Sequence, residues 1–280
     1  MVDIKYSQNF YKNSKNLARI IKSINFSPSD TILDIGAGNG VITKELLKYS
    51  NNIVAYELDY KYFNKLKKDF LNVYSVVLKN KDFLIAKLPQ KDFKIFANIP
   101  FALTSDIINK ITDTDSHLTE AYLFVQKESA KRFMGKPKNT QISTILSSRY
   151  SFSIKEDFKR EDFKPIPNVD IVLLKIVKKN VLEKEYGLYR DFITYIFNQR
   201  NNCVFDTFKK LFTFNQLRHI KKFLNKNEYI KPSDIPVKYY LEIFQYYKTN
   251  GSKYRDRVNG YYEKHIQQHS KREKVYRTRV

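Results

Sequence analysis

The amino-acid sequence predicts an α/β fold, in which an open and mainly parallel sheet is followed by a smaller region made of helices alone. Three observations indicate this fold. Apolar runs of strand length alternate with helical patterns as far as residue 178, a glycine cluster follows the first buried strand, and the apolar residues beyond residue 178 recur at helical spacing. We expect domains at 1–178 and 179–250 and a basic tail at 251–280.

The composition indicates a polyanionic partner. Lys and Arg number 51 against 29 Asp and Glu in 280 residues, which gives a net charge of +22 and a pI near 9.7. Nucleic acid is the first candidate and a membrane surface is the alternative. An A/T-rich genome would also enrich Lys, Asn and Ile. The positive charge therefore has an alternative cause besides selection for a polyanionic partner.

Neither a membrane span nor a metal is expected. No apolar run approaches the roughly 18 residues of a spanning helix, and the first ten residues lack a signal-peptide core. The single Cys203 excludes an internal disulfide, and four scattered histidines do not suggest zinc ligands. We therefore expect a cytoplasmic monomer without a bound metal.

The first strand leads into a glycine turn. The first helical pattern consists of Leu17, Ile20, Ile21 and Ile24, and residues 27–30 end that helix. Thr31–Ile35 is then a buried strand. It runs directly into Gly36-Ala37-Gly38-Asn39-Gly40. Three of the seven glycines in the chain fall within these five residues, which indicates a tight turn and a closely approaching ligand. The helix from Val41 to Tyr49 would point its N-terminus at that ligand. Because Val41 stands where the dinucleotide fingerprint has glycine or alanine, NAD is disfavoured.

Acidic residues follow the next two strands. Residues 53–56 form a strand that ends at Glu57, about twenty residues beyond the glycine turn, where a carboxylate can accept hydrogen bonds from both ribose hydroxyls of an adenosine. A solvated loop acid is the alternative for Glu57. Residues 73–78 form the third strand, and Asp82 after it is a candidate partner for the adenine amino group of the same ligand.

The strand at residues 93–97 ends in Asn98-Ile99-Pro100-Phe101. Asn98 offers a side-chain carbonyl and Ile99 a main-chain carbonyl, while Pro100 has no N–H and forces Ile99 into an extended conformation. Phe101 adds a flat apolar face. An amino group on a planar ring fits this loop, and adenine N6 is the obvious candidate. The alternative is an ordinary turn with an exposed aromatic side chain.

These motifs together resemble the rRNA adenine-N6 dimethyltransferases over roughly residues 6–178. The resemblance rests on Gln8-Asn9-Phe10, residues 34–40, Glu57-Leu58-Asp59, Asp82, Asn98–Phe101, residues 125–128 and residues 162–170. It implies a Rossmann-like class I sheet that uses S-adenosylmethionine. Within this group the chain looks most similar to the Erm enzymes, because of residues 132–137, residues 158–163 and the character of the C-terminal part. That similarity implies methylation of an adenine in bacterial 23S rRNA and resistance to macrolides, lincosamides and streptogramin B.

The resemblance also assigns residues by position. The family's S-adenosylmethionine contacts correspond to Asn9, Tyr11, Gly36, Gly38, Glu57, Asp82 and Asn98. Its site for a flipped or unpaired target adenine corresponds to Asn98, Ile99, Phe101 and Phe163. Many members have tyrosine in place of Phe101, a change that keeps the stacking surface. The alternative for Phe163 is a loop aromatic packed on the core.

The C-terminal third is expected to consist of helices that carry Lys and Arg between apolar stripes. The stripes are Tyr189, Phe192, Ile193, Ile196 and Phe197, then Phe205, Phe208, Leu211 and Phe212, then Leu217, Ile220, Phe223 and Leu224. We interpret them as packing faces rather than base-stacking platforms. Ser233 or Asp234 would cap a last helix ending at Tyr247. In residues 251–280, nine Lys or Arg against three acids predict a partly disordered tail that contacts RNA, and a solvated helix end is the alternative.

Two other functions compete with the Erm assignment. One is a housekeeping dimethyltransferase of small-subunit (16S-type) rRNA. The other is a non-catalytic nucleic-acid-binding factor on the same fold, although the glycine turn, Glu57, Asp82 and the Asn98–Phe101 loop all favour an enzyme.

Overall fold

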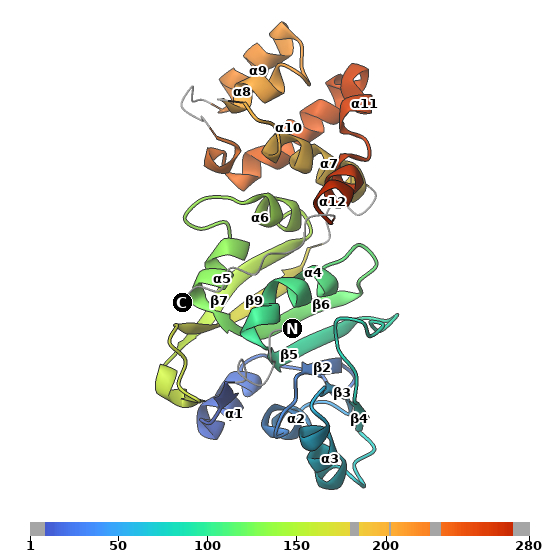
Figure 1. The fold of residues 1–280 in the computed structure, drawn as a ribbon, viewed down its shortest axis with the longest axis vertical. Coiled ribbons are helices and arrows are strands. Elements are labelled where there is room, and N and C mark those ends of the chain that lie inside the picture. Colours follow the sequence, from blue (N-terminus) through green and yellow to red (C-terminus); the bar gives the residue numbers. More distant parts are fainter. Residues whose placement is uncertain (1–8, 180–184, 202, 225–230, 271–280) are drawn as a thin grey trace. The chain divides into compact units, whose positions relative to one another are not determined.

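The computed structural model describes residues 9–179, 185–201, 203–224 and 231–270 (Figure 1). Contacts within the chain group these residues into two units. The first unit comprises residues 9–134 and 150–179, and the second comprises residues 135–149 together with the described residues that follow 179. The main boundary therefore lies close to the expected one, but residues 135–149 fall in the second unit.

A sheet of seven strands forms the centre of the first unit, in the order β4-β3-β2-β5-β6-β9-β7. The five strands from β4 to β6 in this order run parallel, while β9 is antiparallel to both of its neighbours. Consecutive parallel strands require crossovers, and helices supply most of them. The predicted α/β fold is confirmed. The strands are β2 (Thr31–Ile35), β3 (Asn52–Tyr56), β4 (Val76–Lys79), β5 (Phe93–Asn98), β6 (Leu118–Gln126), β7 (Tyr150–Phe158) and β9 (Ile171–Lys178).

The helices of the first unit present apolar stripes to the sheet. The side chain of Asn13 accepts a hydrogen bond from the N–H of Asn16 and caps the helix at Ser14. The buried face of this helix packs into the cluster that includes Phe96 and Tyr122 on the sheet. The helices are α1 (Ser14–Lys22), α2 (Val41–Leu46), α3 (Tyr60–Asp69), α4 (Thr104–Ile111) and α5 (Lys127–Phe133), with short 3₁₀ turns η2 (Phe101–Leu103) and η3 (Arg160–Asp162).

A separate two-stranded ribbon fastens the start of the described chain. Strand β1 (Phe10–Tyr11) pairs antiparallel with β8 (Phe163–Lys164). The main-chain N–H of Lys12 donates to the carbonyl oxygen of Asp162 at 2.7 Å, and Asn13 Nδ2 donates to Asp162 Oδ1 at 3.1 Å. Residues more than 140 positions apart are thereby held together, which fixes the backbone just after Asn9.

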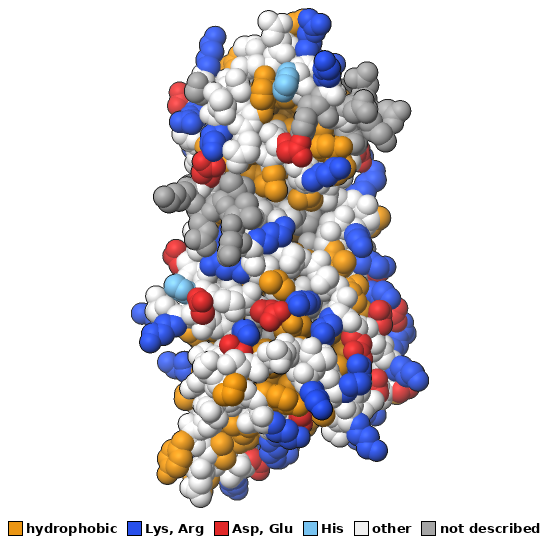
Figure 2. Space-filling view, turned by 180° about the vertical axis from the view of Figure 1, so that it is seen from behind, with side chains coloured by type: hydrophobic (Ala, Val, Ile, Leu, Met, Phe, Trp, Pro, Cys, Tyr) orange, Lys and Arg blue, Asp and Glu red, His pale blue; other side chains and the backbone are white. Residues whose placement is uncertain are grey.

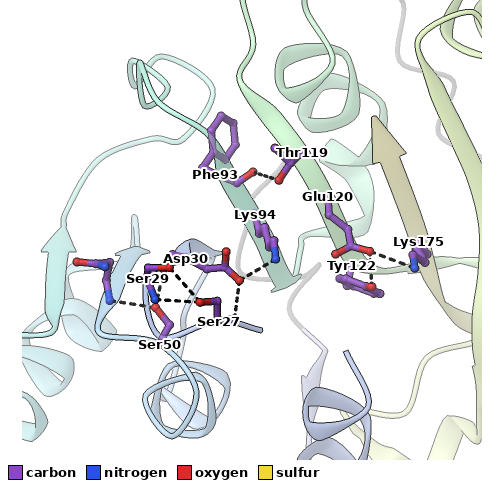
Figure 3. Close-up of polar contacts among 11 residues, drawn as sticks. Ser27, Ser29, Asp30, Ser50, Phe93, Lys94, Thr119, Glu120, Tyr122 and Lys175 are labelled. Carbon is purple, nitrogen blue, oxygen red and sulfur yellow. Dashed lines mark hydrogen bonds and ion pairs between the residues drawn. The ribbon is translucent and has the colours of Figure 1, made fainter. Parts of the chain in front are cut away.

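Ion pairs lie near the amino-terminal ends of β2, β5 and β6 (Figure 3). Lys94 Nζ is 2.7 Å from Asp30 Oδ2, and Lys175 Nζ is 3.1 Å from Glu120 Oε1. Tyr122 also donates its hydroxyl hydrogen to Glu120 Oε1, at 2.6 Å. The glycine turn follows the carboxyl-terminal end of β2. These ion pairs therefore lie at the opposite end of the sheet from the glycine turn.

The second unit is helical and has its own aromatic core. Its largest buried side chains include Tyr189, Phe192, Phe208 and Phe244. The predicted stripes are confirmed as packing faces wherever the side chains are described, and the side chain of Phe223 lies outside the description. The helices are α6 (Gln141–Leu146), α7 (Tyr186–Phe197), α8 (Val204–Phe208), α9 (Phe214–Leu224), α10 (Val237–Asn250), α11 (Arg255–Val258) and α12 (Tyr261–Ser270).

Helix α6 belongs to the second unit because of its side-chain contacts. Ile145 is buried in the core of that unit, and the hydroxyl of Tyr189 donates to the carbonyl oxygen of Thr144 at 3.1 Å. Sequence spacing carries no sign of these contacts, since they join residues more than 40 positions apart.

Two expectations for the C-terminal third are wrong. Ser233 and Asp234 lie in a 3₁₀ turn, η5 (Pro232–Asp234), and α10 begins after Pro236 and is followed by two further helices. Residues 251–270 do not form a separate tail, because they fold as η6 (Ser252–Tyr254), α11 and α12 and bury Val258 completely. Residues 271–280 of the expected tail lie outside the described residues.

The surface carries more blue Lys and Arg side chains than red Asp and Glu side chains on the face shown in Figure 2. In the part of the chain that is described, no helix has the length and apolar content needed to span a membrane.

Candidate active site

The glycine turn lies directly after β2 and is held against β3. The N–H groups of Gly36 and Ala37 both donate to the carbonyl oxygen of Tyr56, at 2.9 and 3.0 Å. Gly38 has a φ of +53°, and a Cβ on it would lie 2.7 Å from Cε1 of Phe10. Glycine is required there both for the left-handed backbone and for the ring that packs across it.

Glu57 follows β3, and its carboxylate is hydrogen-bonded to the glycine turn. Its Oε2 accepts a hydrogen bond from the N–H of Gly38 at 2.7 Å, and its Oε1 accepts one from the N–H of Asp59 at 2.8 Å. The side chain is 4% exposed, and burial raises the pKa of its carboxyl. Each oxygen keeps a second lone pair for a ligand hydroxyl, so positioning the turn and binding a ribose are compatible roles.

A second buried carboxyl, that of Asp34, lies in β2 beneath the turn. Its Oδ2 accepts a hydrogen bond from the hydroxyl of Thr43 at 2.6 Å, while no described residue bonds to Oδ1. Burial raises the pKa of Asp34 to about 7, and the nearby Glu57 contributes in the same direction. Asp34 lies in the strand that the sequence predicted to be buried, but its carboxyl was not among the predicted site residues.

A pocket opens at the carboxyl-terminal ends of β2, β3 and β5. Asn9, Gly36, Gly38, Glu57, Asp82 and Asn98 all line it, which brings together six of the seven predicted cofactor residues. Asp82 is held by its own loop, because its Oδ1 accepts from the N–H of Leu84 at 2.8 Å. Sequence reasoning assigned Ile99 to the site but assigned no role to the other apolar side chains of the lining, which are Phe10, Ile35, Tyr56, Leu58, Phe83, Leu84, Pro100, Leu103 and Ile107.

Tyr11 is the predicted cofactor residue that does not line this pocket. Its ring is 6% exposed and packs against Phe124, Phe158 and Phe163, with ring centroids 5.1 to 5.4 Å away. Its hydroxyl accepts from Asn16 Nδ2 at 2.9 Å. Tyr11 therefore anchors the N-terminal segment in the core, and a contact with the cofactor stays a prediction.

Asn98 ends β5 at the rim of the pocket. Its Nδ2 donates to the carbonyl oxygen of Asn9 at 2.6 Å, across 89 positions of sequence. Among the described residues, no hydrogen bond reaches Asn98 Oδ1. The amide oxygen thus keeps its capacity to accept a hydrogen bond, which is the capacity that binding an amino hydrogen requires.

The predicted target-base residues divide into two groups. Ile99 is 2% exposed and lines the pocket. Phe101, half-buried at the start of η2, is not among the lining residues and packs against the core cluster that includes Tyr11 and Phe163. Phe163 instead is fully buried, with Tyr11 and Phe158 against its ring. The structure does not bring the ring of Phe163 to the pocket, and the core-packing alternative describes its position here.

The pocket suits an adenosine-based sulfonium such as S-adenosylmethionine. Carboxylates at Glu57 and Asp82 provide acceptors for hydroxyl and amino groups, and Phe83, Leu84 and Ile107 provide an apolar wall for a planar ring. Two acidic side chains against one lysine, Lys81, favour a ligand that carries positive charge over a dinucleotide pyrophosphate. This fold and this pocket define the class of Rossmann-like methyltransferases that use S-adenosylmethionine.

Comparison with known proteins narrows this class. The family described as ribosomal RNA adenine dimethylase matches residues 2–249, and the chain belongs to that family. A ribosomal RNA small subunit methyltransferase A from Mycoplasmopsis pulmonis is 33% identical over 230 residues, which are 80% of this chain and 89% of that protein. An rRNA adenine N-6-methyltransferase from Streptococcus sanguinis is 33% identical over 259 residues, which are 90% of this chain and 99% of that protein.

Solved structures agree with the fold. The 23S rRNA methyltransferase ErmE aligns with a TM-score of 0.78 and 19% identity, covering 86% of this chain and all of that one. A dimethyladenosine transferase from Plasmodium falciparum aligns with a TM-score of 0.62 and 22% identity, covering 94% of this chain and 97% of that one. The protein is therefore an S-adenosylmethionine-dependent rRNA adenine-N6 methyltransferase, and the non-catalytic alternative is set aside.

Proposed function

We propose that the substrate is an adenine of bacterial 23S rRNA, and that its methylation confers resistance to macrolides, lincosamides and streptogramin B. The observation that supports this choice best is the extent of the similarity. Relatives named rRNA adenine N-6-methyltransferase match over 88 to 90% of this chain and 97 to 99% of their own length, and two relatives named small subunit methyltransferase A match over 80 to 85% and 89 to 94%. A ribosomal substrate also implies a cytoplasmic location.

Small-subunit rRNA is the second candidate. The Mycoplasmopsis pulmonis enzyme reaches the same 33% identity, so sequence identity does not separate the two substrates. Both candidates share the reaction and the site, and they differ in the RNA that carries the adenine.

Asn98 and Ile99 would make adenine N6 reactive by holding its two N–H groups. The lone pair of this amine is delocalised into the ring, so the site must favour a pyramidal nitrogen. Asn98 Oδ1 and the carbonyl oxygen of Ile99 are neutral acceptors that can bind both hydrogens and direct the lone pair to the cofactor. Bound S-adenosylmethionine supplies the activated methyl group. Positioning for in-line displacement provides much of the acceleration, and the same carbonyl groups stabilise the positive charge that develops on N6.

Phe101 would stack on the target base. An adenine must leave its helix, or be unpaired, to reach Asn98. Phe101 is half-buried and follows Asn98 by three residues in the chain. A second stacking contact, from Phe163 to the other face of the adenine, stays a prediction. It would require the ring of Phe163 to leave its packing against Tyr11.

Mapping the modified nucleotide tests the choice of substrate. Purified protein and S-adenosylmethionine are incubated separately with unmodified 50S-derived 23S rRNA and 30S-derived 16S rRNA, and primer extension locates the methylated adenine. The proposal predicts a stop at one adenine of 23S rRNA and none in 16S rRNA. A stop in 16S rRNA alone would move the assignment to the small-subunit enzymes. Macrolide sensitivity of cells that express the protein provides the matching cellular measurement.

A further inference from the structure

A second cavity adjoins the cofactor pocket at Asn98. Phe10, Gly36 and Asn98 line both cavities, so the segment after Asn9 and the glycine turn separate them. Tyr11 lines the second cavity and not the first. The second cavity alone is also lined by four further polar side chains, those of Lys12, Ser14, Asn39 and Lys164. Sequence reasoning singled out none of these four side chains as a site.

The two cavities differ in charge. The cofactor pocket has Glu57 and Asp82 with one lysine. In the second cavity the charged lining residues are Lys12 and Lys164, and no carboxylate is among its described lining residues. A cationic ligand fits the first cavity and an anionic ligand fits the second.

Lys164 lies in the β1–β8 ribbon, and Lys12 lies directly after it. Lys164 pairs with Phe10 in the β1–β8 ribbon, and Lys12 follows β1 with its N–H bonded to the carbonyl oxygen of Asp162. Both side chains are exposed, and within the described chain neither has a carboxylate at ion-pair distance. The ribbon therefore fixes the backbone of both lysines, while their charges are available to a ligand.

The neutral side chains of the cavity supply further donors. Asn39 Oδ1 accepts a hydrogen bond from Lys65 Nζ at 2.9 Å, which leaves the amide hydrogens of Asn39 as its free capacity. Ser14 adds a hydroxyl. Two ammonium groups with hydroxyl and amide donors match the oxygens of a phosphodiester.

We propose that this cavity binds a backbone phosphate of the RNA strand next to the target adenosine, with Lys12 and Lys164 as its cationic contacts. The inference rests on the proposed presentation of adenine N6 at Asn98. An RNA strand whose base reaches Asn98 has its backbone at the rim that both cavities share. A phosphate held there fixes which nucleotide enters the site, because backbone contacts set the register of a bound nucleic acid.

Charge neutralisation tests this site. The double variant Lys12→Gln/Lys164→Gln is compared with Lys67→Gln/Lys91→Gln, which removes the same charge from two exposed lysines elsewhere in the unit. RNA affinity is measured by filter binding between 50 and 200 mM salt on the rRNA fragment that the wild type methylates. We expect Kd for the site variant to rise at least about tenfold and the salt slope to fall by about 0.7 to 0.9, the value for one lost phosphate contact. The control variant should change Kd and the salt slope much less.

Three further readouts separate binding from folding. S-adenosylmethionine affinity and Tm should stay at wild-type values, kcat at saturating RNA should stay within about threefold, and Lys12→Arg/Lys164→Arg should restore RNA affinity. An RNA with a neutral methylphosphonate beside the target adenosine should weaken wild-type binding and should add little to the loss in the Gln variant. Equal effects of the site and control variants, or fully additive losses with the methylphosphonate, would overturn the proposal.

The outcome does not depend on which ribosomal subunit is the substrate. If the wild type methylates 16S rRNA, the 23S assignment fails and the binding measurements proceed on the 16S fragment. If Lys12 and Lys164 do not contact RNA, the double Gln variant methylates the same adenine as the wild type, and the salt slope of its RNA binding is unchanged.

Discussion

Asn98 Nδ2 donates a hydrogen bond to the main-chain carbonyl oxygen of Asn9 at 2.6 Å. This bond joins the end of β5 to the segment that the β1–β8 ribbon fastens. It occupies an amide hydrogen of Asn98, leaves Oδ1 as the acceptor that the proposed mechanism needs, and joins two residues that line the cofactor pocket. In the proposed mechanism, Asn98 therefore links the position of the methyl donor to that of the methyl acceptor.

Asn98→Asp tests that orientation. A carboxylate keeps an acceptor for N6 but cannot donate to the carbonyl oxygen of Asn9, so the two oxygens repel each other. We expect turnover to fall about 100-fold and S-adenosylmethionine affinity to fall several-fold, because Asn9 moves with the broken bond. Single-turnover methyl transfer and isothermal titration calorimetry measure the two effects. Wild-type cofactor affinity in this variant would show that the bond does not shape the pocket.

Phe101→Ala and Phe101→Tyr separate stacking from side-chain chemistry. Loss of a stacked aromatic costs about 1 to 3 kcal/mol per base, so Phe101→Ala should lower kcat/KM for RNA by roughly tenfold or more. Phe101→Tyr keeps the ring face and should stay within about threefold. Steady-state kinetics with varied RNA concentration give both values. If alanine and tyrosine behave alike, Phe101 is not a stacking surface.

Gly38→Ala should weaken cofactor binding. The backbone there has a φ of +53°, and the added Cβ would meet the ring of Phe10 at 2.7 Å. The left-handed conformation costs a non-glycine residue about 1 to 2 kcal/mol, and displacement of Phe10 should lower S-adenosylmethionine affinity about tenfold.

Gly187→Ala is the matched control for that change. Nothing lies within 4 Å of a Cβ at Gly187, which is in α7, and alanine favours the helix. This variant should be as stable as the wild type or slightly more stable. Equal cofactor affinity of the two variants would contradict the role of the turn.

Asp34 should make stability depend on pH. Its pKa is raised from 3.8 to about 7 in the folded protein, mainly by burial, so the folded state binds the proton more tightly than the unfolded chain does. The stabilising effect is complete below about pH 4 and is lost as the pH rises to about 7. At about 1.4 kcal/mol per pKa unit, the loss is on the order of 4 kcal/mol.

Asp34→Asn removes that titration while its carbonyl can still accept from Thr43. The free energy of unfolding of the variant, measured by urea denaturation at pH 4 to 8, should fall less with rising pH than that of the wild type. Parallel pH curves for the two proteins would show that Asp34 does not titrate in this range.

Local sequence signals predicted the part of the fold that local chemistry determines. The strand Thr31–Ile35 was predicted with its observed bounds, and the strand ending at Asn98 was placed within one residue, because apolar runs bounded by turn residues define both. Asp82 and Glu57 line the pocket as expected, since the carboxyl ends of parallel strands meet at one edge of the sheet.

Features that depend on distant partners were not predicted. Strands β6 and β7 pair with β9, and neither was assigned from the sequence. Burial of Phe163 results from its pairing opposite Tyr11 in the β1–β8 ribbon, and no local pattern distinguishes that from a loop aromatic at the site. The same holds for α6, whose apolar face is covered by helices that begin some 40 residues later.

Transfer of a deuterated methyl group tests the central claim most directly. Wild-type protein and Asn98→Ala are each incubated with labelled S-adenosylmethionine and the rRNA fragment, and nucleoside mass spectrometry follows the label. Labelled N6-methyladenosine should form with the wild type. The alanine variant should form at least 100-fold less while it still binds RNA with only a modest loss of affinity. Wild-type amounts of N6-methyladenosine from Asn98→Ala would contradict the proposed role of this side chain as the acceptor that positions N6.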